Sequence, residues 1–187
     1  EVIYDLAKSK LQEASNENSP FSLFLITINT HHPEGFLSED CSGKKKSFKD
    51  VIRCSSKQLS SFINWIKQQD FYKETTVVVT GDHLAMKNKL YDDYLSINQS
   101  NRDLANFILN SSASNKNARN REYTAVDFFP TTVEAIGGKI SNKKKMLGLG
   151  KSLYSDGKTL VEKMGIEKLN QEVKKRSKTY AQFLKER

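Results

Sequence analysis

The three histidines of the chain are the residues whose types and positions best suit catalysis. His31 and His32 follow one run of apolar residues, and His83 follows another, directly after Gly81 and Asp82. A neutral imidazole beside a carboxylate, as in Asp82-His83, is a suitable ligand pair for a divalent metal such as zinc or manganese. We therefore interpret the two histidine groups together as a candidate metal or catalytic site.

Each group also has a purely structural explanation. The carboxylate of Asp82 could cap a following helical turn by accepting its unpaired backbone N–H groups. The imidazole of His31 or His32 could bond local backbone in a turn before Pro33. Both explanations would have to hold together to remove the site.

Two predicted strands place these residues at their ends. Phe21–Asn29 and Thr75–Thr80 are short apolar runs rich in β-forming residues, which is typical of buried strands. Between them, apolar residues from Phe48 to Ile66 keep helical spacing. A strand, a helix and a strand in this order predict two parallel strands with a right-handed crossover. Ligands bind beyond the carboxyl ends of such strands, so we expect both histidine groups at one edge of the sheet.

The rest of the chain has weaker signals. The expected elements are a helix at 2–14, a strand at 107–109, a surface loop at 111–120, a helix at 124–136 and one or two helices within 159–187. In the helix at 124–136, Pro130 is expected in the first turn and Gly137-Gly138 at the end. The pattern as a whole predicts an α/β fold.

Composition limits the class of protein. The chain has 187 residues, of which 37% are hydrophobic and 28% charged, which fits one globular domain. Its longest apolar run, Phe21–Ile28, is far shorter than the roughly 20 residues that span a bilayer. The first residues read like the middle of a protein, so we expect a piece of a longer chain.

The net charge of +8 would suit an acidic partner. Its lysines are mostly spread out, and no recognition motif accompanies them, so we do not expect nucleic-acid binding.

Cys41 and Cys54 are the two cysteines, too few for a four-cysteine zinc site. In an oxidising compartment they could close a short loop, and otherwise they are two unpaired thiols.

Five segments give the chain a resemblance to bacterial phosphoglycerol transferases of the periplasmic, glucan-decorating type, within the sulfatase and alkaline-phosphatase-like superfamily. They are FLITINTHHPEGF, the helix around Cys54–Ile66, TTVVVTGDHLAM, VDFFPTTVEAIGG and LGLGKSL, in the family's order and approximate spacing. The resemblance runs from about Val2 to Leu153, and the combination of THHP with GDHLAM is its specific part.

The resemblance implies a three-layer α/β/α sandwich of the alkaline-phosphatase and sulfatase type. Residues 1–158 would be the C-terminal half of the catalytic domain, and residues 159–187 a C-terminal helical extension. The family's Thr or Ser nucleophile and an acidic metal ligand would lie before Val2, so the isolated chain is expected to be inactive. Membrane helices are expected upstream, with the domain at the periplasmic face of the inner membrane.

The implied activity is metal-dependent transfer of phosphoglycerol through a covalent enzyme intermediate. The donor would be an anionic phospholipid of the phosphatidylglycerol type, and the acceptor a periplasmic glucan or another polyol. A sulfatase, a phosphoethanolamine transferase or a phosphodiesterase of the same superfamily are the alternative enzymes. A noncatalytic binding module is the alternative from another class.

The resemblance also implies residue roles. Asp82 and His83 match the family's metal-binding pair, whose metal is typically manganese, with magnesium or zinc in relatives. His31 matches the histidine that contacts the substrate phosphate, and it would act as a catalytic and substrate-binding group. The adjacent His32 is close enough to leave the register between the two open.

Three further positions acquire structural roles from the resemblance. Cys41 and Cys54 fall where periplasmic members have cysteines, which favours a disulfide between them. Asp127 and Pro130 match the start of a helix that is structural in the family, so we do not expect them to be catalytic.

Overall fold

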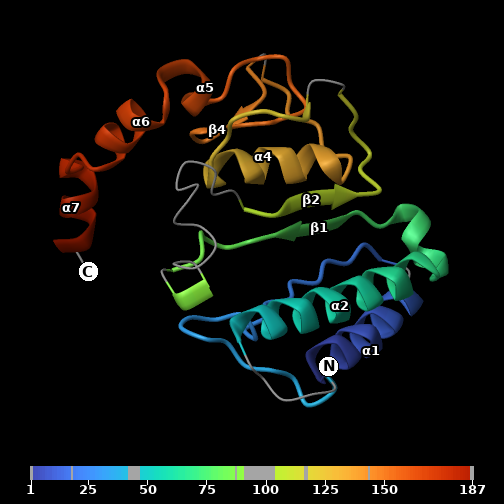
Figure 1. Cartoon of the computed structure of the whole chain (residues 1–187). Coiled ribbons are helices and arrows are strands. Elements are labelled where there is room, and N and C mark those ends of the chain that lie inside the picture. The colour runs from blue at the N-terminus through green and yellow to red at the C-terminus, as the bar shows by residue number, and fades with distance from the viewer. Residues whose placement is uncertain are drawn as a thin grey trace. The chain divides into compact units, whose positions relative to one another are not determined.

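The chain is a mixed α/β protein with two compact units (Figure 1). The computed structural model describes residues 2–17, 19–41, 47–86, 88–90, 104–115, 118–142 and 144–185. Unit 1 consists of Glu1–Thr75 and Val79–Phe107, and unit 2 of Thr76–Val78 and Ile108–Arg187. No described helix combines the length and the apolar character that crossing a bilayer requires.

Two amphipathic helices form the core of unit 1, as the sequence predicts. They are α1 (Val2–Asn16) and α2 (Phe48–Lys67), and a short 3₁₀ helix, η1 (Asp70–Glu74), follows them. Their apolar stripes face each other, with the rings of Tyr4 and Phe62 5.0 Å apart between centroids. The buried side chains are Tyr4, Ala7 and Leu11 on α1 and Phe48, Val51, Cys54, Phe62, Ile63 and Ile66 on α2.

The N-terminus of α2 is capped by its own sequence. Ser47 is the N-cap residue, and its backbone N–H donates to Oδ2 of Asp50 at 3.0 Å. This carboxylate satisfies a donor that the first turn leaves without a partner and has a favourable position relative to the helix dipole. The expected helix between Phe48 and Ile66 is therefore confirmed.

The strand predicted at Phe21–Asn29 does not form. This segment has no regular secondary structure, and the side chains of Phe24, Ile26 and Ile28 are 90%, 78% and 65% exposed. A strand needs a neighbour to accept and donate its backbone hydrogen bonds. Among the described residues, neither two-stranded sheet includes this segment. The predicted strand–helix–strand unit with parallel strands is thus wrong for this structure, although the segment does have the apolar composition of a buried strand.

The second predicted strand does form, and it pairs in the antiparallel sense. β1 (Val77–Thr80) lies beside β2 (Asn106–Leu109), which confirms both expected strands. The backbone N–H of Gly81 donates to the carbonyl of Ala105 at 3.2 Å, and the Thr76 hydroxyl donates to the carbonyl of Asn110 at 3.0 Å. From Thr76 to Gly81 the residue numbers rise, while those of their partners fall from Asn110 to Ala105. The strands therefore run in opposite directions, as their arrows do in Figure 1.

Unit 2 is built around one helix and a small hairpin. The helix is α4 (Ala125–Ala135), and the hairpin consists of β3 (Met146–Leu147) and β4 (Gly150–Lys151) in antiparallel pairing. The described part of the expected loop at 111–120 contains no α-helix or strand. Gly137, with φ of +87°, follows the end of α4, and the N–H of Gly138 donates to the carbonyl of Val133 at 2.8 Å. The expected helix stop is therefore confirmed.

The C-terminal region contains three short helices where one or two were expected. They are α5 (Leu160–Met164), α6 (Ile166–Val173) and α7 (Lys178–Lys185). Gly165, with φ of +76°, separates α5 from α6, because this backbone conformation breaks a helix and suits glycine. The division into 1–158 and 159–187 stays a prediction.

Pro130 lies in the second turn of α4, as its sixth residue, and not in the first turn as predicted. Proline has no N–H, so the carbonyl of Val126 lacks its usual partner four residues on. Gly150 of β4 packs directly against this carbonyl, and a Cβ at Gly150 would overlap with its oxygen. The proline and the glycine together allow the hairpin to approach the helix backbone.

Asp127 is fully buried and joins the same two elements. Its carboxylate accepts the backbone N–H of Thr124 at 2.9 Å and that of Lys151 at 2.8 Å. One side chain therefore caps α4 and fixes β4 to it. These bonds support the structural role that the resemblance implies for Asp127.

A half-buried ion pair holds α5 in unit 2. The Arg121 guanidinium donates to both carboxylate oxygens of Glu162, at 2.9 and 2.6 Å. It also donates to the carbonyls of Leu153, Ser155 and Gly157 at 3.1, 2.8 and 2.7 Å. The guanidinium lowers the pKa of Glu162 to about 2, chiefly through its hydrogen bonds. The pair thus connects the loop after β4 to the first turn of α5.

Unit 2 is expected to lose stability in acid through this pair. The pKa of Glu162 is lower when folded, so its contribution is present above its unfolded value of 4.5 and is lost as the pH falls through about 2. Glu162→Gln should lower the free energy of unfolding by about 2 kcal/mol at pH 6 and by much less near pH 2. Urea denaturation of both proteins at several pH values measures this difference. A difference that stays constant from pH 6 to pH 2 would contradict the assignment.

Candidate functional site

The loop that contains His31 and His32 is closed by backbone hydrogen bonds. The N–H of Gly35 donates to the carbonyl of His31 at 2.9 Å, and the N–H of Phe36 donates to that of Asn29 at 2.7 Å. Gly35 has φ of +59°, and a Cβ there would lie 2.5 Å from the Asn29 oxygen and 2.9 Å from Cγ1 of Val51. The loop therefore packs tightly against α2, and this close packing requires glycine.

Gly35→Ala is expected to displace this loop and to lower the free energy of unfolding by about 2 kcal/mol or more, from an unfavourable φ and a steric clash. Gly148→Ala is a matched control, because Gly148 also has φ of +59° but has no atom within 4 Å of the added Cβ. Urea denaturation of the two variants separates the loss of stability caused by the steric clash from the loss caused by the unfavourable φ. Equal losses in both would show that the contact with α2 is unimportant.

One ring nitrogen of His31 is hydrogen-bonded to the backbone. Its Nδ1 lies 2.8 Å from the carbonyl oxygen of His32, and since a carbonyl only accepts, Nδ1 is the donor. In the neutral ring the Nε2 atom then has a lone pair. Both histidines are exposed. The local backbone bond considered for these residues is therefore present at His31, and it uses Nδ1 and not Nε2.

Asp82 and His83 are adjacent after β1, and their side chains point toward each other. Oδ1 of Asp82 accepts the backbone N–H of His83 at 2.9 Å, and Nδ1 of His83 donates to the carbonyl of Leu84 at 2.9 Å. The remaining atoms, Oδ2 of Asp82 and Nε2 of His83, are 3.5 Å apart. No helix begins directly after Asp82, so the helix-cap explanation of this residue does not apply.

The pair fits a divalent metal. Two ligand atoms, each about 2.1 Å from a tetrahedral ion, lie about 3.4 Å apart, close to the separation between Oδ2 and Nε2. The bond from Nδ1 of His83 to the Leu84 carbonyl fixes the tautomer with the lone pair on Nε2, the form in which a histidine can bind a metal. The Asp82 and His83 side chains are 88% and 59% exposed, so an ion can reach them.

The described residues do not complete a metal centre around this pair. Within the described part of the chain, no three His, Cys, Asp or Glu side chains gather in a way that could hold an ion. His31 and His32 are thus not brought into a ligand group with Asp82 and His83. The two histidine groups were expected at one edge of a sheet because two parallel strands were predicted, and only the second of these strands forms. The roles assigned to these four residues stay predictions.

A disulfide joins Cys41 to Cys54, with the Cα atoms 5.9 Å apart. It connects the segment that follows the histidine loop to the buried side of α2, where Cys54 is 5% exposed. The loop with His31 and His32 is therefore connected to α2 at two places, through Gly35 and through the disulfide.

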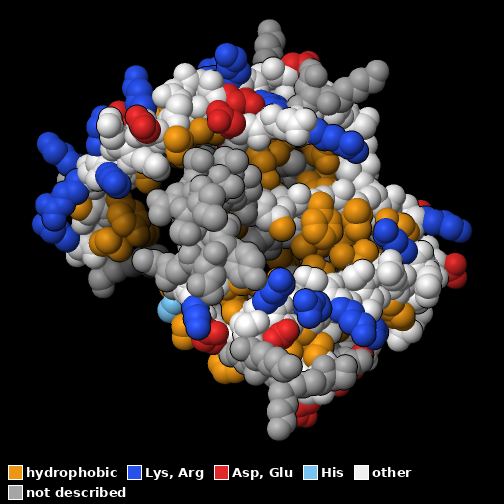
Figure 2. Space-filling model, viewed as in Figure 1, with side chains coloured by type: hydrophobic (Ala, Val, Ile, Leu, Met, Phe, Trp, Pro, Cys, Tyr) orange, Lys and Arg blue, Asp and Glu red, His pale blue; other side chains and the backbone are white. Residues whose placement is uncertain are grey.

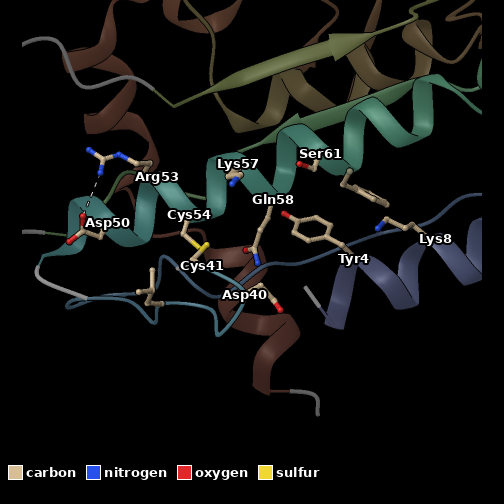
Figure 3. A pocket seen from close by; sticks show the side chains of 12 residues that line it. Tyr4, Lys8, Asp40, Cys41, Asp50, Arg53, Cys54, Lys57, Gln58 and Ser61 are labelled. Atoms are coloured by element: carbon tan, nitrogen blue, oxygen red, sulfur yellow. Dashed lines mark ion pairs between the residues drawn. A yellow bond between two sulfur atoms is a disulfide. The ribbon is translucent and has the colours of Figure 1, made fainter. Parts of the chain in front are cut away.

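A cavity of about 420 Å³ lies beside this disulfide, between side chains of α1 and α2 (Figure 3). Sequence reasoning missed it. The available signal was the spacing of Arg53, Lys57 and Ser61, which places three hydrogen-bond donors along one face of a helix. The lining residues are Tyr4, Lys8, Leu37, Asp40, Cys41, Asp50, Arg53, Cys54, Lys57, Gln58, Ser61 and Phe62.

Comparison with known proteins agrees with the resemblance. The chain is 33% identical over 162 residues to Phosphoglycerol transferase I of Escherichia coli (strain 55989 / EAEC), an alignment that covers 83% of this chain and 20% of the relative. The same figures hold for Phosphoglycerol transferase I of Shigella boydii serotype 18. The chain spans about a fifth of the length of these curated relatives. No solved structure matches.

A family model also matches the chain. The model described as Sulfatase matches residues 1–138, which include both histidine groups, Asp82 and the disulfide. It covers nearly three quarters of the 187 residues. The chain therefore belongs to the sulfatase family.

Proposed function

We propose that this chain is part of a metal-dependent phosphoglycerol transferase, with Asp82 and His83 as metal ligands. The observation that carries the proposal is the 3.5 Å approach of Oδ2 of Asp82 to Nε2 of His83, in a chain similar to proteins named Phosphoglycerol transferase I. The donor is a phosphatidylglycerol-type lipid and the acceptor is a periplasmic glucan or a related polyol. Manganese is the proposed ion, with magnesium or zinc as the alternatives.

The proposed setting follows from the same resemblance. In the full-length protein, these elements would contribute to a three-layer α/β/α sandwich at the periplasmic face of the inner membrane. The uncovered apolar side chains of Phe24, Ile26 and Ile28 support this, because they suit a strand with neighbours on both sides. The site would then stand close to a lipid donor.

The reaction has two displacements at phosphorus. A hydroxyl nucleophile, which we do not assign to this chain, forms a bond to the phosphorus of the donor, and the diacylglycerol oxygen leaves with a proton. An acceptor hydroxyl then displaces the nucleophile and takes the phosphoglycerol group. A bound divalent metal would lower the pKa of the attacking hydroxyl and stabilise charge on the phosphoryl oxygens.

The residues of this chain have defined parts in that chemistry. Asp82 would hold the ion through Oδ2 and His83 through Nε2, and the bond to the Leu84 carbonyl holds the His83 ring in orientation. His31 presents Nε2 while its Nδ1 is bound to the His32 carbonyl. When protonated, Nε2 donates to a nonbridging phosphate oxygen or to the leaving alkoxide.

The test is an assay of transfer by the full-length protein with phosphatidylglycerol and a soluble β-glucan. Mass spectrometry of the glucan and quantification of diacylglycerol follow the two products. We expect both products to form in equal amounts with manganese, to vanish with EDTA and to return when manganese is restored. Glucan modification that continues unchanged in EDTA would contradict the metal dependence.

A further inference from the structure

We infer that the cavity between α1 and α2 is a binding site for a phosphate ester of a polyol or sugar. Its lining does not include His31, Asp82 or His83, and nothing in the proposed transfer requires it. The inference therefore goes beyond the proposed function, and it can be tested without a metal or a reaction.

Two rows of donors face this cavity. On α2, Arg53, Lys57 and Ser61 follow one another at intervals of four residues, so they lie along one side of the helix. On α1, Tyr4 and Lys8 have the same interval, and the Lys8 ammonium also donates to Oδ1 of Asp5 at 3.0 Å. Figure 3 shows the Tyr4 hydroxyl directed toward α2, between the two helices. The cavity is thus lined from both helices by groups that can donate to an anion.

The carboxylates in the lining are already engaged. Asp50 accepts the Ser47 backbone N–H at 3.0 Å through Oδ2 and lies 3.7 Å from Arg53 through Oδ1. Asp40 accepts the Ser38 hydroxyl at 3.0 Å. Among the described residues, no ion pair includes Lys57. An entering anion therefore meets at least one ammonium group that is not neutralised by a described carboxylate.

The floor and the rim of the cavity differ in character. Tyr4, Cys54 and Phe62 are buried, at 7%, 5% and 7% exposure, and form an apolar floor that includes the disulfide. Arg53 and Lys57 are exposed at the rim. Figure 2 shows Lys and Arg side chains on the surface over α2. A ligand with carbon atoms at one end and a phosphate at the other matches this arrangement.

A phosphate ester suits these donors better than a neutral sugar. Its oxygens can accept from a guanidinium, an ammonium and a hydroxyl at the same time, and charge-assisted bonds of this kind are the stronger ones. Gln58 and Ser61 add groups for ligand hydroxyls. A volume of about 420 Å³ falls within the range of small-molecule sites.

The experiment is calorimetric titration of the full chain in EDTA with sn-glycerol 3-phosphate, and separately with phosphatidylglycerol vesicles. Glycerol is the uncharged control ligand. We expect binding of at least one phosphate probe, and about tenfold weaker binding by Lys57→Gln, which loses a charge-assisted bond. Lys67→Gln, an exposed lysine in the last turn of the same helix and outside the cavity, should bind as the unmodified chain does.

The two probes distinguish the source of the phosphate. Binding to the soluble ester that Lys57→Gln weakens supports a soluble ligand, and binding to vesicles alone with the same loss supports a lipid headgroup. Arg53→Gln provides a second test on the same row. Circular dichroism checks that both variants keep their helices. Absence of binding to both probes would overturn the inference. Binding that neither Lys57→Gln nor Arg53→Gln weakens would also overturn it, and so would a loss in Lys67→Gln as large as that in Lys57→Gln.

Discussion

Asp82→Asn in the full-length protein is expected to lower the rate of phosphoglycerol transfer at least about a hundredfold, because an amide oxygen is a much weaker ligand than a carboxylate. The change preserves the shape of the side chain and its acceptance of the His83 N–H. The loss should therefore come from the metal and not from the backbone after β1. Initial rates of diacylglycerol release measure it.

Metal binding gives a second measurement of the same substitution. Titration of the unmodified protein and the variant with manganese should show an affinity at least about tenfold lower in Asp82→Asn. Asp70→Asn is the matched control, since Asp70 is an exposed carboxylate in η1 outside the candidate site. Full transfer and full manganese affinity in Asp82→Asn would show that Asp82 is not a ligand.

Gly150→Ala is expected to be the most destabilising of the structural substitutions. The added Cβ would overlap with the Val126 carbonyl oxygen, and both partners are backbone, so neither can rotate away. The helix and the hairpin would have to separate, which would also weaken the bond from the Lys151 N–H to Asp127. We expect the free energy of unfolding to fall by about 3 kcal/mol or more.

Urea denaturation followed by circular dichroism measures this effect. Gly148→Ala, two residues earlier in the turn of the same hairpin, is the control, because its added Cβ meets no atom within 4 Å. Gly148 has φ of +59°, so this control should cost about 1 kcal/mol from the backbone conformation alone. A free energy of unfolding for Gly150→Ala that is within about 0.5 kcal/mol of that of the unmodified protein would contradict the packing of β4 on α4.

The helices were the most predictable part of the fold. α1, α2 and α4 have apolar residues at helical spacing, and α2 and α4 begin with Ser47 or Thr124 three residues before an aspartate. Such signals are local, so they can be read without knowing the tertiary structure. The three C-terminal helices were less predictable, because Gly165 divides a helical pattern that would otherwise continue.

The partner of each strand could not be predicted from the sequence. Phe21–Asn29 has the composition of a buried strand, yet a strand exists only with a hydrogen-bonded neighbour, and none of the described residues supplies one. β1 and β2 were both expected, but their antiparallel pairing depends on segments about 30 residues apart. Hydrophobic pattern identifies a segment that suits a sheet and does not identify its partner.

The candidate site shows the same division between local and tertiary information. Asp82 and His83 are adjacent in sequence, so their closeness at the end of β1 could be predicted. The cavity needs α1 to lie beside α2, and the contacts of Arg121 reach residues more than 30 positions away. Only a structure can bring such residues together.

The most direct test of the central claim is the intact mass of the full-length protein after incubation with phosphatidylglycerol and manganese, without an acceptor. The account predicts a fraction of protein heavier by one phosphoglycerol group, absent in EDTA and absent in Asp82→Ala. An adduct that forms equally in Asp82→Ala, or in EDTA, would contradict the assignment of Asp82 and His83 as ligands of the metal that activates transfer.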